Sequence, residues 1–381
     1  MTTMQEDQDT FARGRAWLCE RALPFWSTTG RDAASGGFHE RMDLSGAPDH
    51  AAPRRAMVQA RQIAVFSLAH ERGWIDARDI VGPAVEHLIK TYHARDGRPG
   101  WLFSVDAAGM PVDSRRDTYT HAFALFALGW AHAVLDDPRL AALADETLAA
   151  MDALLAAPAG GYRDDEHTGD EALHQNPHMH MFEAMIVLAR LTGEDRFLQR
   201  ARALCGMFTE RFLQPGANVL SENFDSQWQA PALRDMVWEP GHHFEWSWLL
   251  HRFAEVSGDD VGRPAAALYD TAYPQGLDAE GLVIDELSGD GRVLKPSRRC
   301  WPHTEEIKAH AAQHEAGRSG CRERAAATME RLLSRYLSGP FPGGWIEHLD
   351  AAGKPMRDDV PASSLYHLAF AVAEADRVFG A

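Results

Sequence analysis

The sequence predicts an all-α fold, an (α/α)6 barrel of six helical hairpins with short β-hairpin loops at the active-site mouth. Three observations support it. Apolar helical segments begin at a nearly constant interval, a more polar helix lies between successive ones, and each repeat has a loop with a glycine beside an aromatic or aliphatic residue. Because two helices cannot bury their own apolar face, neighbouring repeats must stack. Six stacked units that close on themselves form a barrel.

The apolar segments are the predicted inner helices. They carry apolar or small residues at helical spacing, and several end at a glycine. Their starts are separated by 62, 59, 62, 63 and 62 residues and fall at Gln59, His121, His180, His242, Glu305 and His367. Neither end of the chain carries a polar capping repeat, which favours a closed ring over an open solenoid.

The segments between them complete each repeat. Charged positions on the second helices suit a solvent-facing outer layer, as at residues 137–158, 193–213 and 321–337. In residues 99–111 and 281–291, a short β-prone run is followed by DAAG or SGDG, which predicts a β-hairpin. The repeats run almost from end to end, so we expect a single domain over residues 1–381.

Composition excludes several classes of function. Of the 381 residues, 45% are hydrophobic, and the formal net charge is −17, which disfavours binding to nucleic acids or anionic membranes. No apolar run is long enough for a transmembrane helix, and the acidic, polar start does not resemble a secretory signal. The four cysteines are scattered without a CxxC pair. We therefore expect a cytoplasmic protein.

The polar residues at the inner-helix starts predict an active site. In a closed ring the inner helices run parallel, so their N-termini converge at one end, which we call the mouth. Four of the six starting residues are histidines. A helix N-terminus disfavours protonated imidazole, and a neutral imidazole can accept a proton. The pattern indicates a histidine acid/base site.

Two carboxylates follow histidines by three residues, which places each pair on one helix face. Glu183 follows His180, and Glu245 follows His242. We expect Glu245 to orient His242 or to handle a proton of a substrate hydroxyl. For Glu183 this role and simple satisfaction of backbone N–H groups at the helix start are equally open.

Other polar residues stand near the same level. Asn176 is a plausible N-cap ahead of Pro177. Arg55 could donate hydrogen bonds to sugar hydroxyls or could pair with a glutamate. Trp301 could stack on a sugar ring or could pack in the core. The motifs GxSxG, GxxxxGK[ST] and HExxH are absent, and His178 lacks an ordered set of further ligands, so we expect no metal and no cofactor.

Five segments resemble the N-acylglucosamine 2-epimerase superfamily over essentially the whole chain. They are RRAMVQARQ, NPHMHMFEA, EPGHHFEWSWLL, RRCWPHTEEIKA and SSLYHLAFA. Within that superfamily, WPHTE and GHHFEW look most like the D-mannose isomerase branch. The resemblance implies an (α/α)6 barrel and metal-free proton transfer at C1 and C2 of a sugar.

The resemblance also implies roles for particular residues. His242 and His367 would form the acid/base pair. The predicted substrate-binding residues are Arg55, His121, Asn176, His180, Glu245, Trp301 and Glu305, of which His121 and Glu305 come from their positions at inner-helix starts. His303 stands where we expect glutamine, and Ser363 where some sugar-isomerase relatives carry glutamine. These departures bear on which sugar fits.

The expected function is an aldose–ketose isomerase that interconverts D-mannose and D-fructose through a cis-enediol. His367 would move the proton between C2 and C1, His242 would open the ring and relay hydroxyl protons, and Arg55 and His180 would donate to the enediolate. We expect a monosaccharide as the only ligand, with no nucleic acid or membrane partner, and a monomer or homodimer.

Three alternatives remain open. A sugar 2-epimerase would use the same histidine pair but return the proton to the opposite face of C2. A glycoside hydrolase on an α/α barrel would use two carboxylates across the cleft, for which Glu245 and Glu305 are the candidates. A sugar-binding repeat protein would bind without turnover.

Overall fold

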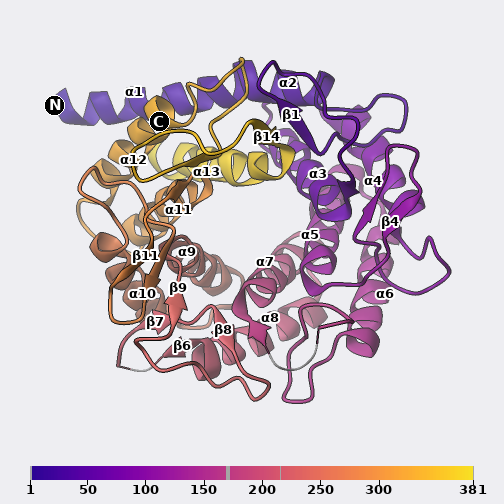
Figure 1. The fold of residues 1–381 in the computed structure, drawn as a ribbon. Helices are drawn as coiled ribbons and strands as arrows, with labels where there is room; N and C mark the ends of the chain where they lie inside the picture. The colour runs from indigo at the N-terminus through magenta and orange to yellow at the C-terminus, as the bar shows by residue number, and fades with distance from the viewer. Residues whose placement is uncertain (1, 169–171, 215, 381) are drawn as a thin grey trace.

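Two concentric rings of helices form the part of the chain that the structure describes. The structure is a computed structural model that describes residues 2–168, 172–214 and 216–380. In Figure 1 the inner helices surround the centre of the ring and the outer helices lie outside them. The inner helices are α3 (Ala56–Glu71), α5 (Thr118–Leu135), α7 (Gln175–Thr192), α9 (Pro240–Ser257), α11 (Trp301–Glu315) and α13 (Leu365–Phe379).

Each inner helix is preceded by an outer segment. The first and fourth outer segments contain a π-helical turn, labelled η1 and η2. The outer segments are α1 (Thr2–Trp17) with η1 (Leu18–Ala22) and α2 (Leu23–Thr28), α4 (Arg78–Tyr92), α6 (Pro138–Leu154), α8 (Asp195–Met207) with η2 (Phe208–Phe212), α10 (Gly262–Gln275) and α12 (Cys321–Arg335).

Short antiparallel strands form hairpins within single loops and also join the loops of neighbouring repeats around the mouth. The strands and their pairings are β1 (Arg41–Asp43) with β14 (Asp359–Pro361), β2 (Arg54–Arg55) with β3 (Ser104–Val105) and β4 (Pro111–Asp113), β5 (Leu173–His174) with β8 (Asn223–Phe224), β6 (Leu213–Gln214) with β7 (Val219–Leu220), β9 (Val237–Trp238) with β10 (Glu286–Ser288) and β11 (Val293–Lys295), and β12 (Arg298–Arg299) with β13 (His348–Leu349). The hairpins predicted in residues 99–111 and 281–291 correspond to β3–β4 and β10–β11, although β4 begins at the last residue of the first segment and β11 lies beyond the end of the second.

The ring closes between the first and last repeats. Each inner helix packs against the next, and α13 packs against α3. Strand β1 pairs with β14, with Met42 opposite Val360. The predicted α/α barrel is therefore confirmed, and the open solenoid is wrong. Residues 169 and 170 of the third glycine-containing loop lie outside the described residues.

Burial follows the two-layer arrangement. Inner helices contact helices on several sides, so α5 is buried from Thr118 to Ala131 except at Tyr119. The outer helix α12 buries one face only, through residues such as Ala325, Met329 and Leu332. Among the described helices, none combines the length and apolar character needed to cross a bilayer.

One hydrogen bond recurs at the start of five inner helices. A side chain in the first turns accepts the backbone N–H of a residue in the preceding loop, at 2.7–3.1 Å. The pairs, acceptor first, are Gln59 with Phe38, His121 with Trp101, His178 with Tyr162, His243 with Leu220, and His303 with Val283. In all four histidines Nδ1 donates to the carbonyl four residues earlier. The bond ties each loop to its helix.

This bond explains the glycine that precedes an aromatic residue in the loops. A Cβ on Gly100 would lie 2.5 Å from Nε2 of His121, and one on Gly161 would lie 2.8 Å from Nε2 of His178. Both glycines also have positive φ, at 84° and 69°. At these two positions a side chain would collide with the ring that accepts the next N–H.

The recurring bond also corrects the repeat alignment. The equivalents of His121 in later repeats are His178, His243 and His303, whereas His180, His242 and Glu305 make different contacts. The predicted alignment treated two polar positions, which lie one or two residues apart, as a single position. It did so because both lie at the start of the inner helix. The series that contains His121, His178, His243 and His303 binds the preceding loops through this hydrogen bond.

We predict that His303→Ala lowers the free energy of unfolding by about 2 kcal/mol, because the buried N–H of Val283 loses its acceptor. His303→Gln should cost less than half of that, since Gln59 makes the equivalent bond with an amide oxygen. Urea unfolding measures both. The control is His167→Ala, which alters an exposed side chain. Equal stability of His303→Ala and wild type would contradict the assigned role.

Candidate active site

Polar side chains from four inner helices meet at the mouth. Short strands immediately precede α7, α9 and α11 and fix where each helix begins. Pro240 occupies the first turn of α9, where its missing N–H costs nothing. Helix α7 begins at Gln175 with His174 as its N-cap, so the prediction that Asn176 caps this helix is wrong. Asn176 instead lies in the first turn.

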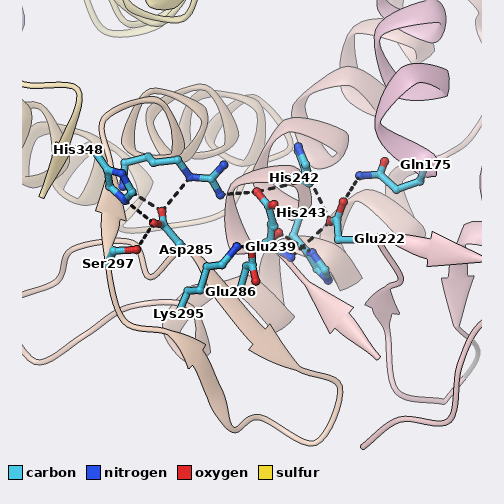
Figure 2. Close-up of polar contacts among 11 residues, drawn as sticks. Gln175, Glu222, Glu239, His242, His243, Asp285, Glu286, Lys295, Ser297 and His348 are labelled. Carbon is cyan, nitrogen blue, oxygen red and sulfur yellow. Dashed lines mark hydrogen bonds and ion pairs between the residues drawn. The ribbon is translucent and has the colours of Figure 1, made fainter. Parts of the chain in front are cut away.

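His242 is held by a carboxylate from the loop between β7 and β8. Its Nδ1 lies 2.9 Å from Oε1 of Glu222, and Nε2 of Gln175 donates to Oε2 of the same carboxylate at 2.9 Å (Figure 2). Trp246 donates in turn to Oε1 of Gln175 at 2.7 Å. Each group in this chain has a fixed partner, so the orientation of the imidazole is fixed.

The charge of His242 follows from its neighbours. Burial opposes protonation, but Glu222 and Glu239 outweigh it and raise the pKa of His242 to about 9. Glu239 pairs with Arg299 at 2.6 Å, and Arg299 also contacts Asp285 at 3.0 Å. Figure 2 shows that this series of polar contacts continues from Asp285 to His348. His242 is therefore an imidazolium at neutral pH.

His367 has the opposite protonation state. Its Nδ1 lies 2.8 Å from Oε1 of Glu305, whose Oε2 lies 2.6 Å from Nζ of Lys308. Burial lowers the pKa of His367 below its ordinary value, which outweighs the attraction of Glu305. The ring is therefore neutral, with its proton on Nδ1 toward Glu305 and with Nε2 unprotonated.

The indole of Trp301 lies next to both histidines. Its ring centre is 5.1 Å from that of His242 and 5.4 Å from that of His367. A Cβ on Gly241 would lie 2.5 Å from this indole, so the glycine permits the close approach of α9. The two imidazoles thus share one aromatic neighbour at the mouth.

A second group of carboxylates lies deeper in the ring. Glu183 accepts a hydrogen bond from the hydroxyl of Tyr366, and its other oxygen lies 3.2 Å from Nδ1 of His180. Neither carboxylate oxygen of Glu245 has a hydrogen-bond partner among the described residues. Burial and the nearby Glu305 raise the pKa of Glu245 well above its ordinary value.

The predicted Arg55 and the nearby Arg61 differ in their partners. Arg55 pairs with Glu40 at 2.5 Å. Arg61 donates to the hydroxyl of Tyr119 at 2.7 Å and stacks over the ring of Phe123. Neither pairs with Glu183, Glu245 or Glu305 in the contacts described.

The structure brings most of the predicted site residues together. His180, His242, Glu245, Trp301, Glu305 and His367 form one connected group. His121 does not join it, because both of its ring nitrogens bind backbone groups. His303 likewise accepts a hydrogen bond from the backbone N–H of Val283, so its assignment to sugar specificity is not supported. The Oδ1 atom of Asn176 is buried without a partner among the described residues.

Several residues of this group were missed. Glu222 orients His242 in place of the predicted Glu245, and it lies in the fourth loop, where the repeat pattern is weakest. Gln175, Arg299 and Lys308 were also missed. Lys308 carried a usable signal, because a lysine one turn after Glu305 stands in an otherwise buried helix.

Among the described residues, four clusters have ligand types and spacing that could hold a metal ion. One, His251 with Glu255 and Glu315, contains none of the predicted site residues; the other three are His180 with Glu183 and Glu245, Glu222 with Glu239 and His242, and Glu245 with Glu305 and His367. The fit of the last two is poor, because each already holds a cationic side chain. Lys308 lies 2.6 Å from Glu305, and Arg299 lies 2.6 Å from Glu239. Lysine and arginine satisfy these carboxylates in the way that an ion would.

The arrangement can donate a proton from one side and accept one on the other. A protonated His242 and an unprotonated Nε2 of His367 lie beside one aromatic ring. General acid/base chemistry needs this pairing of groups in opposite states.

Comparisons with known proteins identify the family. The family model described as N-acylglucosamine 2-epimerase (GlcNAc 2-epimerase) matches residues 36–371. The chain is 33% identical to a protein named mannose-6-phosphate isomerase from Rhizobium meliloti, over 94% of each chain. It is 25% identical to the D-mannose isomerase of Thermobifida fusca, over 90% of this chain and 89% of the other.

Solved structures share the fold. The cellobiose 2-epimerase of Bacillus thermoamylovorans has a TM-score of 0.86 at 21% identity, covering 96% of this chain and 98% of that one. A D-mannose isomerase structure has a TM-score of 0.82 at 21% identity, covering 94% and 96%. The chain belongs to the N-acylglucosamine 2-epimerase family and is a sugar isomerase or epimerase of that family.

Proposed function

We propose that this protein is a metal-independent aldose–ketose isomerase that interconverts D-mannose and D-fructose through a cis-enediol. The observation that carries the proposal is the pair of histidines in opposite protonation states beside Trp301. We propose further that the whole chain acts as one catalytic domain and that Arg55, Asn176, His180, Glu245, Trp301 and Glu305 surround the sugar.

In this mechanism His367 is the base and His242 is the acid. Nε2 of His367 takes the proton from C2 of the open-chain aldose, while His242 gives a proton to O1, and the enediol forms. His367 then returns its proton to C1, and His242 recovers a proton from O2. Both histidines end as they began, so the cycle balances. In the earlier ring opening His242 gives its proton to the ring oxygen and recovers one from the O1 hydroxyl, so it is protonated again before the enediol forms.

Charge pairing at the mouth supports an uncharged substrate. Arg54 pairs with Asp32 at 2.7 Å, Arg55 with Glu40 and Arg299 with Glu239. A sugar phosphate would have to displace these carboxylates. The Rhizobium meliloti relative is named for a phosphorylated sugar, but these ion pairs favour free mannose here.

An epimerase is the second candidate, because relatives of 22–26% identity are named cellobiose 2-epimerase. It would need the proton returned to the opposite face of C2, and both histidines are available for that. The hydrolase alternative has less support, because both oxygens of Glu305 are already bound by His367 and Lys308. Membership of an enzyme family also disfavours a non-catalytic sugar-binding protein.

The pH profile tests the acid role of His242. Because activity requires protonated His242, kcat/KM should fall as pH rises through about 9. Glu222→Gln removes the anion that stabilises the imidazolium, so the alkaline limb should move about 1 unit or more toward lower pH. The matched control is Glu286→Gln, whose carboxylate contacts Lys295 instead. An unmoved alkaline limb in Glu222→Gln would remove His242 as the acid.

Product analysis in D2O separates isomerase from epimerase. The base exchanges its proton with solvent during the lifetime of the enediol, so D-mannose should give fructose with deuterium at one C1 position of one stereochemistry. NMR of the early product identifies the label. Glucose labelled at C2 as the main early product would mean that the enzyme is an epimerase.

Chelation tests metal independence. Enzyme dialysed against EDTA should keep its full turnover, because imidazoles carry every proton in the mechanism. Turnover lost on dialysis and regained with one divalent ion would show that a cluster such as His180, Glu183 and Glu245 holds a required metal.

A further inference from the structure

A lysine is completely buried one turn below Glu305 on α11. The side chain of Lys308 has no exposed surface, and its Nζ lies 2.6 Å from Oε2 of Glu305. The same Nζ lies 3.9 Å from the ring centre of Trp248. Burying an ammonium group is costly unless nearby anions compensate. The cost of burying this charge indicates that Lys308 has a role that a smaller apolar residue could not perform.

The groups around Lys308 come from four inner helices. Its own helix contributes Glu305, and the others contribute His180 and Glu183 from α7, Glu245 from α9, and Tyr366 and His367 from α13. Three of these are carboxylates, and Glu305, Glu245 and Glu183 all stabilise the charge of Lys308. Lys308 is thus the counter-ion of a buried acidic cluster.

Glu305 is shared between two partners. One oxygen faces Nδ1 of His367 at 2.8 Å, and the other faces Lys308. Burial opposes ionisation of Glu305, but Lys308 and His367 outweigh it and lower its pKa to about 2. Lys308 therefore already balances the charge of Glu305, and the carboxylate accepts a hydrogen bond from Nδ1–H of His367. A carboxylate without this balance would draw a second proton onto the imidazole.

We propose that Lys308 is a positioning residue that balances the negative charge of Glu305 and thereby keeps His367 an unprotonated base. Its ammonium acts in two ways. It shares the negative charge of Glu305, and it repels a positive charge on His367. The importance of this for turnover rests on the proposed function, in which Nε2 of His367 takes the C2 proton.

The test is a titration of the histidine rings by NMR in the full-length enzyme without substrate. Lys308→Met removes the charge and keeps the length of the side chain, and Lys308→Arg keeps the charge. In Lys308→Met the pKa of His367 should rise by about 1 unit or more relative to wild type, and Lys308→Arg should restore it. The acid limb of kcat/KM should move to higher pH by the same amount, with KM nearly unchanged.

The controls separate charge from structure. Lys295→Met removes an exposed lysine that pairs with Glu286, and it should leave the titration of His367 unchanged. If Lys308→Met does not fold, Lys308→Gln serves, since its amide can donate to Glu305 but carries no charge. An unchanged pKa of His367 in a folded, uncharged variant would overturn the proposal.

The titration does not depend on the sugar. A raised pKa of His367 in the variant together with no turnover of mannose by wild type would support the role of Lys308 and reject the proposed substrate. Fructose labelled at C1 in D2O together with an unchanged pKa of His367 in the variant would support the proposed substrate and reject the role of Lys308.

Discussion

The rest of the structure depends on the hydrogen bond that joins each loop to the start of the next inner helix. Five described repeats use it, four through histidine and the first through Gln59. The bond is buried, so breaking it leaves a backbone N–H without water. It fixes the loops over the helix starts, and those loops carry Glu222 and Asp285 to the mouth. The structural histidines therefore position the loops that contact the histidines of the candidate site.

The same helix starts create two different environments for imidazole. His242 faces two loop carboxylates, Glu222 and Glu239, and carries a proton. His367 faces one carboxylate whose charge Lys308 already balances, and it stays neutral. Both rings are buried to a similar degree, so the number and balance of nearby charges decide the difference. One kind of side chain can then serve as acid and as base at a single pH.

The fold could be predicted from the sequence because a constant interval between apolar helices has few structural solutions. The site could be predicted only in part. His242, His367 and Glu305 stand at repeat positions and Trp301 lies four residues before one of them, so spacing and resemblance found them. Glu222 could not be found in this way, because its contact with His242 crosses 20 residues from a loop without a clear pattern. His121 was misassigned because two polar positions at the helix start, one structural and one facing the mouth, differ by only one or two residues in register.

The central claim is that the two histidines hold opposite protonation states beside one indole. Neutron diffraction from crystals of the deuterium-exchanged enzyme near pD 7 would locate the deuterons directly. The account predicts deuterium on both ring nitrogens of His242 and, in His367, on Nδ1 alone, with Nε2 bare. A doubly deuterated His367, or a singly deuterated His242, would contradict it.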